Sequence, residues 1–350
     1  MRLAPRPLLA LSALALLAAG YTAFWFYEAG VVRSGLAEWT AVRRAEGMTV
    51  DYEAPRISGF PLRIKARVEH PTIADPAQHW RWRGDAVEAA AFPWAFRHVT
   101  VHPIGRQELS FVVAGDTAVM TASAAEASAT VAVGERGALQ KGSFDAADIT
   151  LSLPGAAGAV SARLVHVELA AAASPSGDAK GPALAPSLAI ALRIEDLTLP
   201  AAAAGPLGPQ LGQLTAEGQL RGPLDGKSAL AALAGWRDAG GTLELKSFSL
   251  AWGPLQLAGN ATLALDPNMQ PEGAGTAQIR GFEETIDGLV EHGLVKANDG
   301  AIAKGVLGLL AKTPPDGGPK LLTVSLTIQK QALYAGPIRL LRLPTLRWAG

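Results

Sequence analysis

Histidine, serine and carboxylate side chains are the groups of this chain that could do chemistry, because its 350 residues include no cysteine. Thiolate nucleophiles, disulfides and iron–sulfur clusters are therefore excluded. His98 and His102 are four residues apart in a segment that alternates like a strand. Their side chains would then lie about 13 Å apart, too far to share one metal ion. The other histidines have no ligand spacing, so we predict no metal site.

Motifs that mark catalysis are also missing. Gly222–Ser228 imitates a phosphate-binding loop, but three residues separate its glycines where that loop needs four, and a turn leading into a helix explains it better. The Gly-x-Ser-x-Gly turn of serine hydrolases does not occur. The adjacent carboxylates Glu195-Asp196 and Glu283-Glu284 define no acid–base pair without a structure. We therefore predict no catalytic residue and no cofactor, and expect that the chain is not an enzyme.

A cluster of tryptophan and arginine is the most unusual surface candidate. Trp80, Arg81, Trp82 and Arg83 alternate, which in a strand places the indoles on one face and the guanidinium groups on the other. With Trp94, they could form a lipid-contact rim in which arginines bind anionic headgroups and rings lie at the acyl boundary. The alternative is two core tryptophans with solvated arginines behind them, and we favour that alternative.

The N-terminal stretch Leu8–Tyr27 carries no charge and is long enough, at about 30 Å as a helix, to cross a membrane. Arg2 and Arg6 precede it, so we expect a cytoplasmic N-terminus and a translocated remainder. A cleaved signal peptide is the alternative, but cleavage would leave an aromatic cluster at the new terminus. We predict an uncleaved single-pass anchor. Its marker residues are Leu8, Leu17, Tyr21, Trp25 and Tyr27.

Beyond the anchor, residues 33–47 are predicted to form a separate juxtamembrane helix after a break at Gly30. An amphipathic helix on the outer leaflet is one interpretation. A helix that packs on the folded body is the other, and we favour it because the apolar stripe is narrow.

Most of the remaining chain alternates with the period of strands. Phe60–Glu69 and Leu321–Gln329 are the clearest examples, and half-buried alternation of this kind is typical of antiparallel sheets. The alternation changes phase between Ile194 and Leu197 and again between Leu245 and Phe248, which predicts β-bulges. The predicted fold is mainly β (α+β), with long, curved, bulged antiparallel sheets. Helices are expected near 228–238 and 282–312, packed on or in the concave face.

Composition divides the predicted exported part into two lobes. Residues 1–32 are assigned to the cytoplasmic stub and anchor, 48–170 to a first β-rich lobe and 187–350 to a second. A flexible connector is expected at 171–186, which is rich in alanine, proline and glycine. Lys plus Arg and Asp plus Glu both number 31, and this zero net charge argues against a nucleic-acid partner.

Several segments carry a resemblance to a known family. Ile57–Arg63, Trp80-Arg81-Trp82 and Trp236–Leu245 resemble an alphaproteobacterial family of membrane-anchored proteins of unknown function. That family has no established catalytic residues to transfer. The anchor and the closing Gly336–Leu340 are more distantly similar to AsmA-like envelope proteins. That similarity implies a curved sheet anchored in the bacterial inner membrane, with the bulk of the chain in the periplasm and a role in lipid transport.

Two functions are compatible with these features. The first is a lipid-handling protein whose apolar concave face holds acyl chains, with the bilayer and a phospholipid as partners. The second is a non-catalytic structural or assembly factor of the envelope, with unidentified protein partners, whose concavity is filled by its own helices. An open apolar groove would support the first, and a dry, packed concavity the second.

Overall fold

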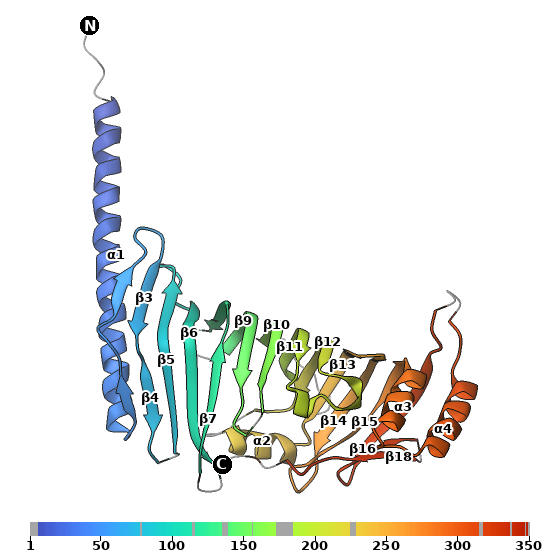
Figure 1. Ribbon diagram of the computed structural model, residues 1–350. Coiled ribbons are helices and arrows are strands. Elements are labelled where there is room, and N and C mark those ends of the chain that lie inside the picture. The colour runs from blue at the N-terminus through green and yellow to red at the C-terminus, as the bar shows by residue number, and fades with distance from the viewer. Residues whose placement is uncertain are drawn as a thin grey trace. The chain divides into compact units, whose positions relative to one another are not determined.

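The computed structural model describes residues 6–77, 79–113, 116–134, 139–155, 157–172, 185–224, 229–314, 318–336, 338–346 and 348. The protein is mainly β (Figure 1). It consists of two compact units, Met1–Ala138 and Leu139–Gly350. The antiparallel β class predicted from the alternation is confirmed.

Unit 1 combines one long helix with a small antiparallel sheet. Strand β5 pairs with β3, β4 and β6, β2 extends the sheet from β3, β1 pairs with β4, and β7 and β8 both pair with β6. The elements are α1 (Arg6–Ala45), β1 (Thr49–Asp51), β2 (Arg56–Ser58), β3 (Ile64–Glu69), β4 (Thr72–Asp75), β5 (Trp80–Ala91), β6 (His98–Val113), β7 (Asp116–Ser123) and β8 (Glu126–Val133).

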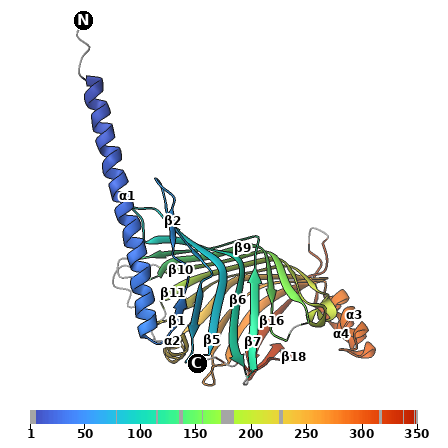
Figure 2. The same cartoon turned by 60° about the vertical axis from the view of Figure 1, so that its left-hand side comes forward.

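Helix α1 is continuous, and the predicted break at Gly30 does not occur. Glycine inside a helix costs about 1 kcal/mol relative to alanine. The neighbouring turns offset that cost by packing, because Trp25 and Ala29 form a core cluster with Ile64 of β3. Farther along, the Thr40 side chain hydrogen-bonds that of Tyr52, so the second half of α1 packs on unit 1 as favoured above. The first half projects beyond the strands (Figures 1 and 2).

The predicted strand Phe60–Glu69 is shorter than expected. Strand β3 begins at Ile64, and Gly59–Arg63 is a tight loop closed by a hydrogen bond from Arg63 N to Gly59 O of 3.0 Å. Gly59 has φ +99°, and a Cβ there would lie 2.6 Å from the Arg63 carbonyl oxygen. The alternation of Phe60 and Leu62 with polar neighbours therefore reflects a loop, not a pleat.

Unit 2 is built on one antiparallel sheet in which each strand pairs with the next along the chain, from β9 to β18. Helix α2 connects β12 to β13 at one end of the strands, and α3 and α4 connect β15 to β16 at the other end. The strands are β9 (Leu139–Ser152), β10 (Ala159–Ala171), β11 (Pro186–Thr198), β12 (Gln210–Arg221), β13 (Thr242–Trp252), β14 (Leu255–Leu265), β15 (Pro271–Arg280), β16 (Leu322–Gln329), β17 (Ala332–Ala335) and β18 (Ile338–Arg342). The helices are η1 (Ala201–Ala203), η2 (Gly205–Leu207), α2 (Ala229–Asp238), α3 (Phe282–Glu291) and α4 (Ala297–Leu310).

Pairing register gives this sheet one apolar face and one polar face. In the row that crosses β10 to β13, Val167 lies opposite Leu192, Leu192 opposite Ala216, and Ala216 opposite Phe248. The next residues along each strand are polar in most rows, as where Thr276 lies opposite Ser325. Successive side chains of a strand point to opposite faces, so the apolar residues share one face from β9 to β17.

The predicted bulge between Leu245 and Phe248 is confirmed, since the pairing of β13 with β14 shifts between these residues. The β-bulge predicted in β11 between Ile194 and Leu197 is not present. The register of β11 with β12 is unbroken between Ile194 and Leu197, and the change of phase occurs at Asp196, which has φ +51°. Asp148 on β9, two strands away, has φ +50°, so the neighbouring strands change phase together and stay in register.

The division between the units lies at Ala138–Leu139. Most of the predicted connector 171–186 lies outside the described residues, which stop at Ala172 and resume at Ala185. The strands on either side of it, β10 and β11, are neighbours in the sheet of unit 2.

Candidate functional site

A hollow of about 230 Å³ lies on the apolar face of unit 2. It lies over β13 to β17, and its lining is almost entirely apolar. The lining residues are Leu245, Phe248, Asn260, Ala261, Leu263, Gly273, Ala274, Gly275, Leu326, Ile328 and Leu333.

Small residues in the two central strands create this hollow. Ala261 of β14 lies opposite Gly275 of β15, and the large side chain of Leu326 lies on the next strand. A Cβ on Gly275 would lie 2.3 Å from the Asn260 carbonyl oxygen, so glycine is needed for the two backbones to approach. The floor of the site is therefore backbone and alanine, while leucine, isoleucine and phenylalanine form its walls.

The large apolar side chains around the hollow remain partly accessible. Leu245, Phe248 and Leu326 are only half-buried, although they lie on the apolar face of the sheet. Helices α3 and α4 contribute no residue to the lining of this hollow. Apolar side chains that remain accessible together on one face are the usual mark of a surface that binds apolar ligands or partners.

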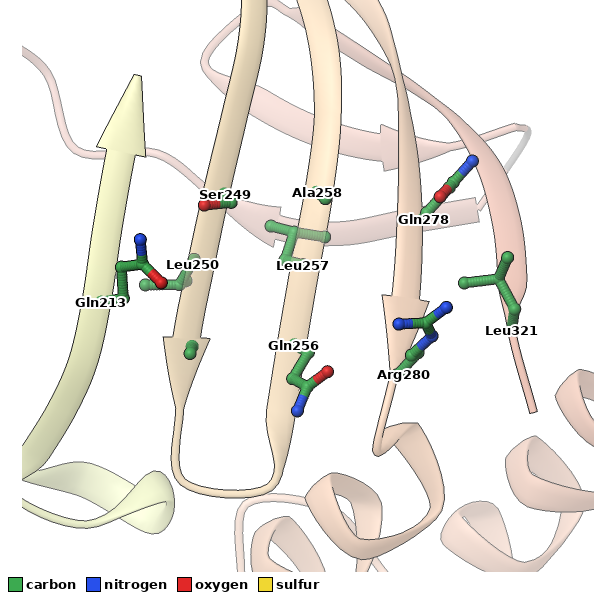
Figure 3. Close-up of a pocket in the computed structure, with 10 residues that line it drawn as sticks. Gln213, Ser249, Leu250, Gln256, Leu257, Ala258, Gln278, Arg280 and Leu321 are labelled. Carbon is green, nitrogen blue, oxygen red and sulfur yellow. The ribbon is translucent and has the colours of Figure 1, made fainter. Parts of the chain in front are cut away.

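The opposite, polar face of the same strands has a second hollow, of about 350 Å³ (Figure 3). Gln213, Gln256, Gln278 and Arg280 line it from β12, β14 and β15, with Ser249 of β13 between them. The Arg280 Nε atom is buried and makes no hydrogen bond within the described part of the chain. Amide groups and a single guanidinium can bind water or a polar group, but this lining includes no carboxylate, histidine or other general base.

The predicted rim residues do not form one site. Trp80 and Trp82 are partly buried on one face of β5, and Arg81 and Arg83 are exposed on the other. Trp94 lies in the loop after β5, separated from Arg83 by the remaining eight residues of the strand, or roughly 25 Å. The indoles and the guanidinium groups of Trp80–Arg83 thus lie on opposite faces as predicted, with both indoles only partly buried, and Trp94 lies on another surface.

Among the described residues, one helix, α1, is long and apolar enough to cross a membrane. Leu17 and Tyr27 are exposed on it, whereas Trp25 is only 4% exposed. The Trp25 indole donates a hydrogen bond of 3.0 Å to the Arg63 carbonyl oxygen, and the Tyr21 hydroxyl donates one to the Pro61 carbonyl oxygen. Two of the predicted anchor residues, Tyr21 and Trp25, therefore also hold the Gly59–Arg63 loop against the helix.

Ionisable groups with shifted pKa values lie in surface ion pairs, not in either hollow. A hydrogen bond with Glu53 raises the pKa of His70, and the pKa of Glu195 is lowered chiefly by its hydrogen bond from Arg193. Within the described ranges, no group of three or more histidine, aspartate or glutamate residues is placed to hold a metal ion.

The apolar hollow was not predicted from the sequence. Its signal was present as the run of alternate small residues Gly259, Ala261, Gly273 and Gly275, next to the phase change at Leu245–Phe248. Which strands pair, and in which register, decides whether such residues meet, and alternation alone does not fix this.

These features define a class: an antiparallel sheet protein with an open apolar face and an N-terminal helix able to span a membrane. The family model described as "Uncharacterized protein conserved in bacteria (DUF2125)" matches residues 25–344, and the chain belongs to that family. No curated protein and no solved structure matches the chain.

Proposed function

We propose that this protein is anchored in the bacterial inner membrane by α1 and binds the acyl chains of phospholipids on the apolar face of unit 2 in the periplasm. The observation that carries the proposal is the apolar face that runs in register from β9 to β17 and is hollowed over β13 to β17. The resemblance to AsmA-like envelope proteins, inferred from the sequence alone, is the second ground for proposing a role with lipids.

The dimensions of the face suit an acyl chain. Strands lie about 4.8 Å apart, so the apolar rows from β9 to β16 extend about 34 Å across the sheet. One acyl chain spans one leaflet, about 15 Å or half of the ~30 Å hydrocarbon of a bilayer, so the face is long enough to hold a whole chain. The hollow of about 230 Å³ exceeds the ~150 Å³ of an apolar cavity that stays dry and binds benzene. Water gains no hydrogen bonds from such a lining, whereas a methylene chain loses none by entering it.

The polar hollow on the opposite face would bind a polar ligand, and we do not propose it as the main binding site. Its glutamine side chains are exposed and can be hydrated where they are, so binding a ligand there would exchange one set of hydrogen bonds for another with a small net gain. Removing apolar surface from water stabilises a complex by about 25 cal/mol for each Å², which the apolar face can supply.

Photo-crosslinking tests the proposal in a bilayer. The full chain would be placed in vesicles of phosphatidylethanolamine and phosphatidylglycerol that contain a phospholipid with a diazirine in its acyl chain. After illumination and proteolysis, we expect lipid adducts on peptides from β13, β14 and β16 as well as on α1. Adducts confined to α1 would show that the chain is anchored but does not bind lipid on its sheet.

A further inference from the structure

We propose that two loops of unit 1, Gly59–Arg63 and Phe92–Arg97, form a membrane-contact site that enters the headgroup region of the bilayer crossed by α1. The proposal rests on the anchoring part of the proposed function and is independent of lipid binding by unit 2. Its occupant is the bilayer itself, on the side to which the chain is exported.

The first loop is fixed directly to the predicted membrane-spanning segment. The Tyr21 hydroxyl donates a hydrogen bond to the Pro61 carbonyl oxygen, and the Trp25 indole donates one to that of Arg63. The Phe60 ring packs edge-on against Trp25, with 5.5 Å between ring centroids, and stacks on Phe26 at 6.3 Å. The depth of this loop in the membrane is therefore set by the depth of α1.

Helix geometry then gives that depth. The uncharged stretch of α1 is bounded by Arg6 and Glu28, so a bilayer core cannot shift along the helix by more than a few residues without burying a charge. At 1.5 Å per residue, Trp25 lies about 29 Å from Arg6, and the hydrocarbon core is about 30 Å thick. Tyr21 lies about 6 Å nearer the centre of the bilayer than Trp25. The loop that both residues hold is thus at the outer boundary of the hydrocarbon.

The second loop lies beside the first at the same edge of the sheet. Strands β3 and β5 are antiparallel with Ile64 opposite Ala91, so the loop before β3 and the loop after β5 are adjacent. The Arg63 guanidinium lies 5.2 Å from the centre of the Phe92 ring, and Phe92 stacks on Trp94 with 5.4 Å between centroids. Arg63 therefore joins the two loops, with a cation at the level of the lipid phosphates.

Both loops expose large apolar side chains, which is unfavourable if water surrounds them. Phe60 is 50% exposed, Leu62 63% and Trp94 62%. Tryptophan, other amphipathic rings and arginine are the side chains that favour the membrane–water interface, where a ring contacts acyl chains and a cation contacts phosphate. The position beside α1 selects the bilayer rather than a soluble partner as the group that covers them.

Depth-dependent quenching tests this site in the full chain, which has no native cysteine to interfere with labelling. Leu62→Cys and Trp94→Cys each place a polarity-sensitive fluorophore on one loop. Val112→Cys is the matched control, because Val112 is also exposed (46%) but lies near the far end of β6, roughly 45 Å from the start of that strand. Each variant would be reconstituted in phosphatidylethanolamine–phosphatidylglycerol vesicles that carry a quencher near the headgroup in both leaflets.

We expect several-fold stronger quenching and a blue-shifted emission for both loop labels compared with the Val112 label. Flotation of the same vesicles measures anchoring separately. A chain that floats, and whose Leu62 and Trp94 labels respond like the Val112 label, would overturn the membrane-contact site while leaving the anchor in place. A chain that does not float would overturn both proposals.

Discussion

The most informative perturbation fills the apolar hollow with a side chain of the protein. Ala261 lines the hollow and lies opposite Gly275, so the ring of Ala261→Phe enters empty space rather than a packed core. If a methylene group takes about the same volume as a water molecule in the liquid, about 30 Å³, the hollow of about 230 Å³ accommodates about seven methylenes. Each buried methylene is worth about 0.8 kcal/mol, so the site could contribute at most about 6 kcal/mol to binding an acyl chain.

The added ring has six carbons and leaves room for few methylenes. Even a loss of only half the contribution, about 3 kcal/mol, would weaken acyl-chain binding about 100-fold. The assay is the yield of diazirine-phospholipid adducts on β13–β16 peptides at a probe level below saturation, with adducts on α1 as the internal standard. Thr262→Phe is the matched control, because the next residue of β14 is exposed on the opposite face.

We expect Ala261→Phe to abolish adducts on the sheet peptides and Thr262→Phe to leave them unchanged. An Ala261→Phe protein that unfolds at the same denaturant concentration as the natural chain and retains its sheet adducts would refute the reasoning. So would an equal loss in both variants, since a ring on the polar face cannot occupy the hollow.

Three further predictions concern stability and ionisation. The pKa of His70 is raised by its hydrogen bond with Glu53, so Glu53→Gln should lower the His70 pKa in a proton NMR titration. Because the pKa of His70 is higher in the folded than in the unfolded state, this contact stabilises the fold fully at pH values below the unfolded-state pKa. Its stabilisation is lost as the pH rises through the folded-state pKa. An unchanged His70 titration would contradict this. Trp236 is buried and donates a hydrogen bond of 2.7 Å to the Arg221 carbonyl oxygen, so Trp236→Phe should reduce the free energy of unfolding by about 1–3 kcal/mol in a urea titration, and no loss would show that α2 is held otherwise. Gly59→Ala places a Cβ 2.6 Å from a carbonyl oxygen at φ +99°, so it should destabilise unit 1 by about 1 kcal/mol or more in the same assay, with an unchanged transition as the contrary result.

Local patterns predicted the strands well where both faces of the sheet differ in polarity. Leu322, Val324, Leu326 and Ile328 alternate with polar residues, and β16 occupies this segment as expected. The phase change at Leu245–Phe248 likewise predicted a real shift of register, because an apolar side chain on the polar face would be exposed to water.

Features that depend on distant contacts were not predictable in the same way. Gly30 has low helix propensity, but the packing of Trp25 and Ala29 on Ile64 keeps α1 continuous. Gly59–Arg63 alternates like a strand, but its backbone closes a loop against α1. Tertiary contacts overrode local preference in both cases.

The site shows the same limit. Alternation predicted that the sheet would have an apolar face, but the hollow forms only where Ala261 of one strand meets Gly275 of the next. Likewise, Trp94 was grouped with Trp80 because both are aromatic residues in one stretch of sequence, whereas β5 separates them by most of its length.

Site-specific crosslinking from the two faces of β16 tests the central claim most directly. Leu326 lies on the apolar face opposite Gly275, and its neighbour Ser325 lies on the polar face opposite Thr276. A benzophenone amino acid placed at either position in the full chain, in living bacteria, reports what contacts that face. We expect phospholipid adducts by mass spectrometry at position 326 and none at 325. Protein adducts alone at 326, or lipid adducts of equal yield at both positions, would contradict the claim.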